Sequence, residues 1–199
     1  MTCQFSIKTF DELTSVDLYH ILKARSQVFV VEQNCAYQDM DEVDFDCLHL
    51  VAHKDETLVG YCRIIAPESS TSATNTLPMP RIGRVLVLPK YRGEGLARQI
   101  MTHAIKHCRK KYGKKPIAIS AQTYLLNFYE SLGFVRASEF YLTDGLEHVD
   151  MVLPIIKKSK AKNLKLGGSE GSGFATKLLS FLLLILSLMF IAGLIYLMT

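Results

Sequence analysis

Cysteine is sparse in this sequence and shows no pairing. The five cysteines form an odd set, and no two of them are spaced as CxxC. A disulfide framework calls for an even set, and a structural zinc site calls for closely spaced pairs, so the sequence argues against both. The cysteine usage agrees with a reducing compartment.

Common phosphate-binding and metal-binding motifs are missing as well. Neither GxxxxGK[ST] nor GxGxxG occurs in the sequence. His103 and His107 lie four residues apart, but the residues between them do not complete an HExxH zinc motif. The segment DMDEVDFD lacks the central glycine and the terminal glutamate of an EF-hand loop. We therefore expect no bound metal.

Charge is absent from one long stretch near the C-terminus. Residues 178–198 are 21 residues without a charged side chain, and a helix of that length reaches about 31 Å, close to the hydrocarbon thickness of a bilayer. The stretch predicts a transmembrane helix. Its position predicts a single-pass tail anchor, because residues 1–10 lack the apolar segment of a signal peptide.

Six lysines lie between residues 157 and 177, and no charged residue follows the apolar stretch. The positive-inside rule then predicts a domain that faces the cytosol, and the lack of basic residues at the C-terminus favours the endoplasmic reticulum among membranes. The lysines could attract anionic lipids or form a nucleic-acid or nuclear-localisation patch; next to a membrane span the first reading is preferred, so nucleic acid is not an expected partner. Because GGSEGSG is typical of a flexible linker, we expect a domain at 1–156, a linker at 157–177 and a transmembrane helix at 178–198.

Hydrophobic spacing within the domain predicts alternating strands and helices. The expected helices are residues 16–30, with Ser15 as N-cap, residues 96–112, ending at Gly113, and residues 123–132. An acidic loop follows the first helix, and turns are expected at residues 55–56 and 143–145. The expected strands are residues 4–9, 47–54, 57–66, 81–88, 116–121, 134–142 and 148–153.

The segment KYRGEGLARQI, residues 90–100, joins an expected strand to an expected helix. A helix that begins at glycines directs free backbone N–H groups and the positive end of its dipole toward one point, which suits a phosphate. Gly93 and Gly95 would let a diphosphate approach the backbone, and Arg92 and Arg98 add positive charge. A glycine turn with solvated arginines explains the same residues equally well.

Two motifs together resolve that choice by resemblance. Residues 92–97, RGEGLA, match R/Q-x-x-G-x-G/A, and residues 127–134, NFYESLGF, match N-x-Y-x-x-x-G-F. This pair resembles the GNAT N-acetyltransferase superfamily, and FVVEQNCAYQDMDEVD with DGLEHVDM is similar to its ElaA-like branch. The resemblance covers about residues 1–155. It implies an α/β (α+β) GNAT fold: a mixed, mostly antiparallel seven-stranded sheet, flanked by helices and splayed between its fourth and fifth strands. The C-terminal membrane helix is a departure from that branch.

The resemblance also implies a coenzyme A site. The backbones of Val85 and Val87 would bind the pantetheine arm, and a fourth-strand N–H would polarise the thioester carbonyl. Tyr129 would be the general acid that protonates the departing thiolate, with Asn127 bonding the pantetheine arm. The diphosphate would be held by the loop residues Arg92, Gly93, Glu94, Gly95, Leu96 and Ala97.

The resemblance implies a general base that is often a carboxylate on the fourth strand, but residues 81–88 contain none, so the base is left open. Glu32, His49 and His148 are candidates, as is a chain of water molecules. His148 is attractive because a histidine exchanges protons near neutral pH. The acidic loop could recognise a cationic acceptor, or it could be a solvated turn.

These features predict an acyl-CoA-dependent N-acyltransferase, using acetyl-CoA as co-substrate and a primary amine of a small molecule or protein as acceptor. A homodimer is possible. The alternative is a membrane adaptor that has the fold and binds coenzyme A without turnover. Acyl transfer of the kind that acyl-homoserine-lactone synthases carry out, or transfer to a non-amine acceptor, has no direct support in the residues.

Overall fold

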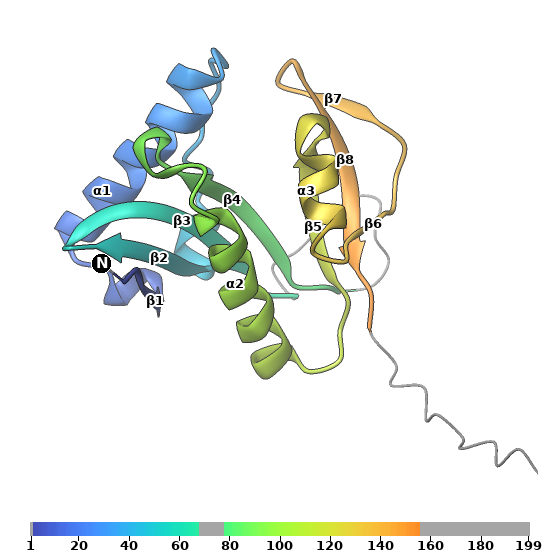
Figure 1. The fold of residues 1–199 in the computed structure, drawn as a ribbon, viewed down its shortest axis with the longest axis horizontal. Helices are drawn as coiled ribbons and strands as arrows, with labels where there is room; N and C mark the ends of the chain where they lie inside the picture. Colours follow the sequence, from blue (N-terminus) through green and yellow to red (C-terminus); the bar gives the residue numbers. More distant parts are fainter. Residues whose placement is uncertain (1, 68–77, 156–199) are drawn as a thin grey trace, which may run out of the picture. The chain divides into compact units, whose positions relative to one another are not determined.

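A mixed sheet runs through the whole domain (Figure 1). The computed structural model describes residues 2–67 and 78–155. Within them the sheet has eight strands, in the order β1-β2-β3-β4-β5-β8-β6, with β7 also paired to β8. Neighbouring strands are antiparallel except for β4 and β5. The strands are β1 Gln4–Lys8, β2 Leu48–Lys54, β3 Thr57–Ile65, β4 Arg81–Val87, β5 Ile117–Gln122, β6 Val135–Arg136, β7 Tyr141–Thr143 and β8 Leu146–Leu153.

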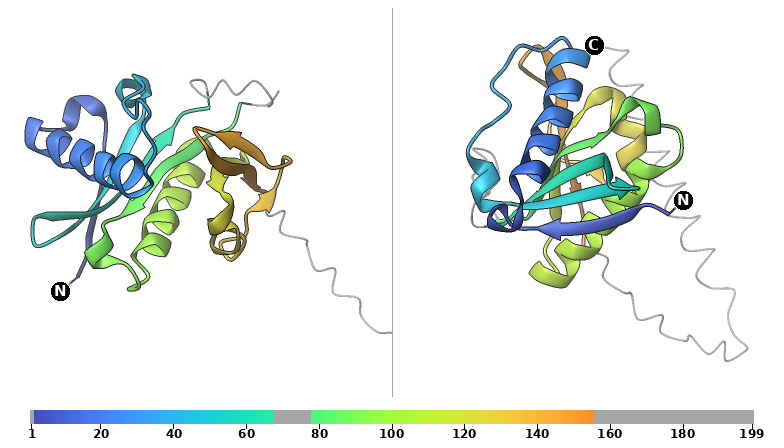
Figure 2. Two further views of the ribbon diagram at one scale, coloured as in Figure 1. Left: turned by 90° about the horizontal axis from the view of Figure 1, so that it is seen from above. Right: turned by 90° about the vertical axis from the view of Figure 1, so that its left-hand side faces the viewer.

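Two helices cover opposite faces of the N-terminal part of the sheet (Figure 2). On one face, α1 (Ser15–Arg25) and the π-helical segment η2 (Ser26–Glu32) pack Ile21 and Val28 against Val51 and Tyr61. On the other face, the buried side chains of α2 (Leu96–Tyr112) pack against alternate residues of β2 and β3. Because successive strand residues point to opposite faces, the same strands serve both cores.

The ends of these helices follow from local hydrogen bonds. The first helix is capped by Thr14 rather than by the expected Ser15, because Thr14 and Asp17 form a capping box: the Thr14 hydroxyl accepts from the Asp17 N–H, and the Asp17 carboxylate accepts from the Thr14 N–H. The second helix ends at Gly113, whose φ of 68° suits glycine, so the predicted end is confirmed.

The sheet opens between β4 and β5. Arg81 pairs with Ala118, and no further Cα pair joins the two strands in the described residues. Figure 1 shows the ribbons of β4 and β5 diverging beyond this point. The splay implied by the family resemblance is therefore confirmed.

The C-terminal part of the sheet differs from the expectation. Residues 134–142 are not one strand but two short ones, β6 and β7, so the described sheet has eight strands instead of seven. Between them, Ser138 leaves the ladder, and its hydroxyl accepts the N–H of Asp150. The expected helix at 123–132 is likewise divided, into the 3-10 turn η5 (Thr123–Leu125) and α3 (Leu126–Glu130).

In residues 2–67 and 78–155 no helix has the length and apolarity to cross a bilayer. The predicted linker at 157–177 and transmembrane helix at 178–198 lie outside the described residues.

Candidate active site

A cavity of about 760 Å³ lies where the sheet opens. Its walls come from η2 and the loop after it, from β4, from the end of β5 with η5 and α3, and from the β7–β8 turn. A volume of this size is typical of a site for a small molecule or cofactor.

A bulge in β4 forms part of the floor. Tyr61 lies opposite Leu86, whereas Arg63 lies opposite Gly83, so β4 contains one more residue than β3 over this stretch. Arg84, within the bulge, has a φ of 51°, which is a strained value for a long side chain. Beyond the bulge the Leu88 N–H donates to Val59 on β3 at 3.0 Å. Because peptide groups alternate along a strand, the N–H of Val87 points toward the cavity instead.

The loop before α2 has the geometry of a diphosphate cradle. Gly93 and Gly95 have φ values of 84° and 76°, and a Cβ built on either would meet no atom within 4 Å. No side chain caps the N-terminus of α2, so its first N–H groups are open to an anion. The residues present therefore fit the diphosphate of coenzyme A.

The other predicted loop residues have different positions. Arg92 and Ala97 line the cavity, Leu96 is buried in the core, and Glu94 points to Lys54, with 2.5 Å between its Oε2 and the lysine Nζ. Val85 and Val87 both line the cavity.

Tyr129 lies in α3 with its side chain 6% exposed and facing the cavity. Its ring packs edge-on against Phe128 and Phe134. Burial raises the pKa of Tyr129 above its ordinary value, so the phenol is protonated at neutral pH. Its hydroxyl has no hydrogen-bond partner in the described part of the chain, which leaves the proton available to a bound molecule. Asn127 is exposed and does not line the cavity.

Glu32 lines the cavity next to Arg92, in the loop before α2. Its carboxylate accepts two hydrogen bonds from Arg92, at 2.6 Å and 2.9 Å, while Arg92 Nε donates to the Val87 carbonyl at 2.9 Å. The hydrogen bond with Glu32 raises the pKa of Arg92. Glu32 is thus held by Arg92 of the loop before α2, an arrangement that does not suit a general base.

His148 lies in β8 and lines the opposite wall. Its Nδ1 is 2.8 Å from the Leu146 carbonyl, and a carbonyl can only accept, so Nδ1 carries the proton. In the neutral ring this leaves a lone pair on Nε2, for which the described residues supply no hydrogen-bond partner. Of the three proposed bases, His148 is the one that lines the cavity with a ring nitrogen unpaired among the described residues.

His49 does not line the cavity, so its expected place beside the acceptor is wrong. It is 1% exposed, and its ring is fixed by two hydrogen bonds: Nε2 donates to the Asp44 carbonyl at 3.0 Å, and Nδ1 accepts from the Tyr61 hydroxyl at 2.8 Å. Burial lowers the pKa of His49. The residue is a neutral support for the core.

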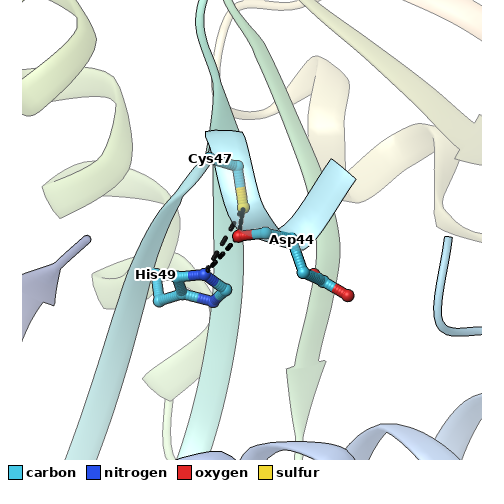
Figure 3. Close-up of side chains that lie close together, drawn as sticks. All are labelled: Asp44, Cys47 and His49. Atoms are coloured by element: carbon cyan, nitrogen blue, oxygen red, sulfur yellow. Dashed lines mark hydrogen bonds between the residues drawn. The ribbon is translucent and has the colours of Figure 1, made fainter. Parts of the chain in front are cut away.

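Cys47 lies close to His49 and Asp44, but the three residues are poorly arranged for a metal ion (Figure 3). Cys47 Sγ and His49 Nε2 lie 3.7 Å apart and both contact the backbone oxygen of Asp44. The Asp44 carboxylate points away from them and binds Arg25 and Arg63. Burial raises the pKa of the Cys47 thiol to about 12, so it is not the thiolate that a metal needs.

The acidic loop is tied into a network of buried ion pairs that the sequence did not predict. Asp39 pairs with Arg25 at 2.7 Å and with Arg84 at 2.6 Å, and Asp44 pairs with Arg25 at 2.7 Å. Asp41 pairs with Arg63. Asp39 and Asp44 are thus buried and bound to arginines of the same domain, so neither is solvated or open to a cationic acceptor.

The position of Arg25 in the sequence could have predicted this network. It lies four residues after Ile21 and three before Val28 on the buried stripe of the first helix, where a charge requires a buried partner.

Two contacts connect the walls across the cavity. The side-chain amides of Gln33 and Gln122 donate to each other, both at 3.1 Å. The thiol of Cys35 donates to the Asp144 carbonyl in the β7–β8 turn at 3.2 Å. They connect the segment after α1 to the C-terminal wall.

Comparison with known proteins agrees with this geometry. The sequence matches the acetyltransferase (GNAT) domain family over residues 14–155, and the chain belongs to that family. It is 38% identical to Protein ElaA of Escherichia coli over 148 residues, which are 73% of this chain and 93% of that protein. A Schizosaccharomyces pombe protein of the UPF0039 group is also 38% identical, over 154 residues.

Solved structures share the fold. An acyl-CoA N-acyltransferase from Pseudomonas aeruginosa superposes with a TM-score of 0.70 at 35% identity, covering 76% of this chain and 99% of that one. Escherichia coli ElaA superposes with a TM-score of 0.68 at 37% identity over the same shares. The acyl-homoserine lactone synthase BjaI, at 17% identity and a TM-score of 0.64, resembles this chain in fold alone.

Proposed function

We propose that the chain transfers an acetyl group from acetyl-CoA to a primary amine. The observation that carries the proposal is one cavity lined by the β4 bulge, by a protonated Tyr129, by a His148 whose Nε2 is unpaired, and by Arg92 and Ala97, which flank the glycines of the loop before α2. An anion-binding loop, a hydrogen-bond donor, an acid and a base are the groups that acyl transfer from a thioester to an amine requires.

Each group has one task in this proposal. Nε2 of His148 accepts the proton that the attacking amine loses, and an N–H of β4 near the bulge stabilises the negative charge that develops on the thioester oxygen. The hydroxyl of Tyr129 donates its proton to the sulfur as the thiolate leaves. The base and the acid lie on β8 and α3, so a bound thioester can lie between them.

Release of free thiol from acetyl-CoA in the presence of a panel of amines tests this proposal. We expect amine-dependent release by the intact protein and at least about a 100-fold loss in His148→Ala, the scale of general-base catalysis. The exposed His20 offers a matched control, since His20→Ala should leave the rate unchanged. Coenzyme A binding without thiol release from any amine would favour the adaptor instead.

We further propose that residues 178–198 tether the domain to a membrane, with the domain in the cytosol and the endoplasmic reticulum as the favoured membrane. The support is the uncharged run of 21 residues and the six lysines that precede it. Extraction with alkaline carbonate should leave the full chain with the membrane and release a version ending at residue 156. A membrane-bound short version would contradict the anchor.

A further inference from the structure

Three ion-paired arginines line the cavity, but their carboxylate partners do not. Arg63, Arg81 and Arg84 line the cavity. The carboxylates that pair with them are not part of its lining: Asp39, Asp41, Asp44 and Asp150. These three arginines thus belong to the cavity lining, whereas the fully buried Arg25 and the four carboxylates do not.

Arg84 is fixed in place from three directions. Its backbone has the left-handed φ of 51° inside the β4 bulge, and a bulky residue keeps such a conformation only when its surroundings impose it. Its Nε donates to Asp39 at 2.6 Å, and the guanidinium lies 5.9 Å from the Phe29 ring centre and 5.8 Å from that of Tyr37. Its Nη1 makes no hydrogen bond to the described residues. The group is therefore pre-positioned with an unused donor.

Arg81 brings a second guanidinium close to the proposed base. It lies where β4 and β5 separate, and its Nη2 is 3.6 Å from the Asp150 carboxylate, which is longer than a hydrogen bond. Asp150 and His148 are two residues apart on β8, so their side chains share a face, about 7 Å apart along the strand. A short molecule whose amine lies at His148 can therefore also contact Arg81.

The cavity lining contains fewer acidic residues than arginines. Of the described lining residues, the acidic ones are Glu32, which is bound to Arg92 at the diphosphate end, and Asp144 in the β7–β8 turn. A doubly cationic acceptor would face the three arginines, whereas an acceptor with a carboxylate would find donors already oriented.

We propose that the acceptor is an amine that also carries a carboxylate, as an amino acid does, and that Arg84 and Arg81 bind this carboxylate while His148 takes the amine proton. The inference rests on the proposed acyl transfer and names the chemical class of its acceptor. It replaces the cationic acceptor suggested by the acidic loop.

The first test uses the unmodified full-length chain. Thiol release from acetyl-CoA is measured with the twenty amino acids and with the same amino acids as carboxamides, so that each pair differs in one charge. A charge-assisted hydrogen bond predicts a kcat/KM about 10- to 100-fold higher for the best amino acid than for its amide. Equal rates, or faster amides, would overturn the carboxylate assignment while leaving acyl transfer itself established.

The second test uses variants and separates binding from turnover. Arg84→Gln and Arg81→Gln should each raise KM for the amino acid about 10-fold or more and leave KM for the amide within about 2-fold. Arg136→Gln removes an exposed arginine of β6 outside the cavity and should change neither. Arg84→Lys, which keeps the charge, should recover part of the affinity. Unchanged KM values in both glutamine variants would refute the assignment.

Calorimetry distinguishes failure of this inference from failure of the proposed function. Amino acids are titrated into the full-length chain saturated with coenzyme A. Binding that Arg84→Gln weakens, without thiol release from acetyl-CoA, would uphold the carboxylate site and reject catalysis. Absence of both binding and release would reject both.

Discussion

Asp39 is the centre of the buried ion-pair network, and its replacement by asparagine tests what the network contributes. The residue is 1% exposed. Its Oδ2 accepts from Arg25 Nε at 2.7 Å, and its Oδ1 accepts from Arg84 Nε at 2.6 Å and from the Tyr37 hydroxyl at 2.8 Å. Asp39→Asn keeps the size of the side chain, removes the charge, and turns an amide NH2 toward at least one donor.

The expected loss is a sizeable part of the domain's stability. Removing one partner of a buried ion pair costs about 3–5 kcal/mol. Asp44 still pairs with Arg25 after the substitution, so we expect the lower end, about 3 kcal/mol. For a domain of this size each kcal/mol lowers Tm by about 2–4 °C, which gives a decrease of roughly 6–12 °C.

The loss should depend on pH. Burial alone would raise the pKa of Asp39, but Arg25 and Arg84 outweigh it and hold that pKa below its ordinary value of 3.8. A carboxyl with a lowered pKa stabilises the fold fully above its unfolded pKa, and this contribution disappears as pH falls through the lower folded value. The Tm difference between the two proteins should therefore be constant above about pH 5 and shrink below about pH 4.

Thermal unfolding followed by circular dichroism between pH 3 and pH 7 measures both effects. Asp46→Asn is the control, because Asp46 is an exposed carboxylate of the same loop, and its Tm should stay within about 2 °C of the unmodified protein. A Tm for Asp39→Asn within the same 2 °C at pH 7, or a difference that grows on acidification, would show that the buried pairs do not act as described.

Three further substitutions address the cofactor end and the acid. Tyr129→Phe should lower turnover about 100-fold and change coenzyme A affinity little, because it removes a proton donor and keeps the ring; equal turnover would exclude Tyr129 as the acid. Glu32→Gln should tighten coenzyme A binding by roughly 2- to 5-fold, since an exposed ion pair contributes about 0.2–1 kcal/mol and its loss frees Arg92 for the diphosphate. Calorimetry that shows weaker binding would contradict this. Gly95→Trp should abolish coenzyme A binding by filling the cradle, and an unchanged Kd in the folded variant would refute the loop assignment.

The sequence predicts the parts of this molecule that depend on local geometry. The helix before Gly113, the Asp55–Glu56 hairpin turn and the glycine loop before α2 each need a particular residue at a particular place. Asp55 and Glu56 have φ values of 47° and 63°, as a tight hairpin turn requires. Because such signals lie within a few residues of one another, a single sequence reveals them.

Features that depend on distant pairs escaped prediction. The register that inserts an extra residue in β4 is visible only against β3, and the strained φ of Arg84 has no sequence signature. His49 was expected beside the acceptor, yet its ring is buried and hydrogen-bonded to Tyr61 and to the Asp44 carbonyl. Glu32 pairs with Arg92, which lies sixty residues away in the sequence. Side chains on two walls can be assigned to a site only once the fold has brought the walls together.

The buried network and the acceptor end of the cavity depend on each other. Burying the charges of Asp39 and Arg25 contributes little net stability compared with an apolar core of the same shape, so stability alone does not explain why the domain contains them. Asp39 also holds Arg84 in a strained conformation, with the guanidinium against two aromatic rings and one donor unused. A carboxylate behind an arginine fixes its direction without occupying all of its donors. Asp39→Asn should therefore weaken acceptor binding as well as lower stability. At temperatures far below Tm the variant stays folded, so the increase in KM that persists there measures how much the network contributes to orienting Arg84.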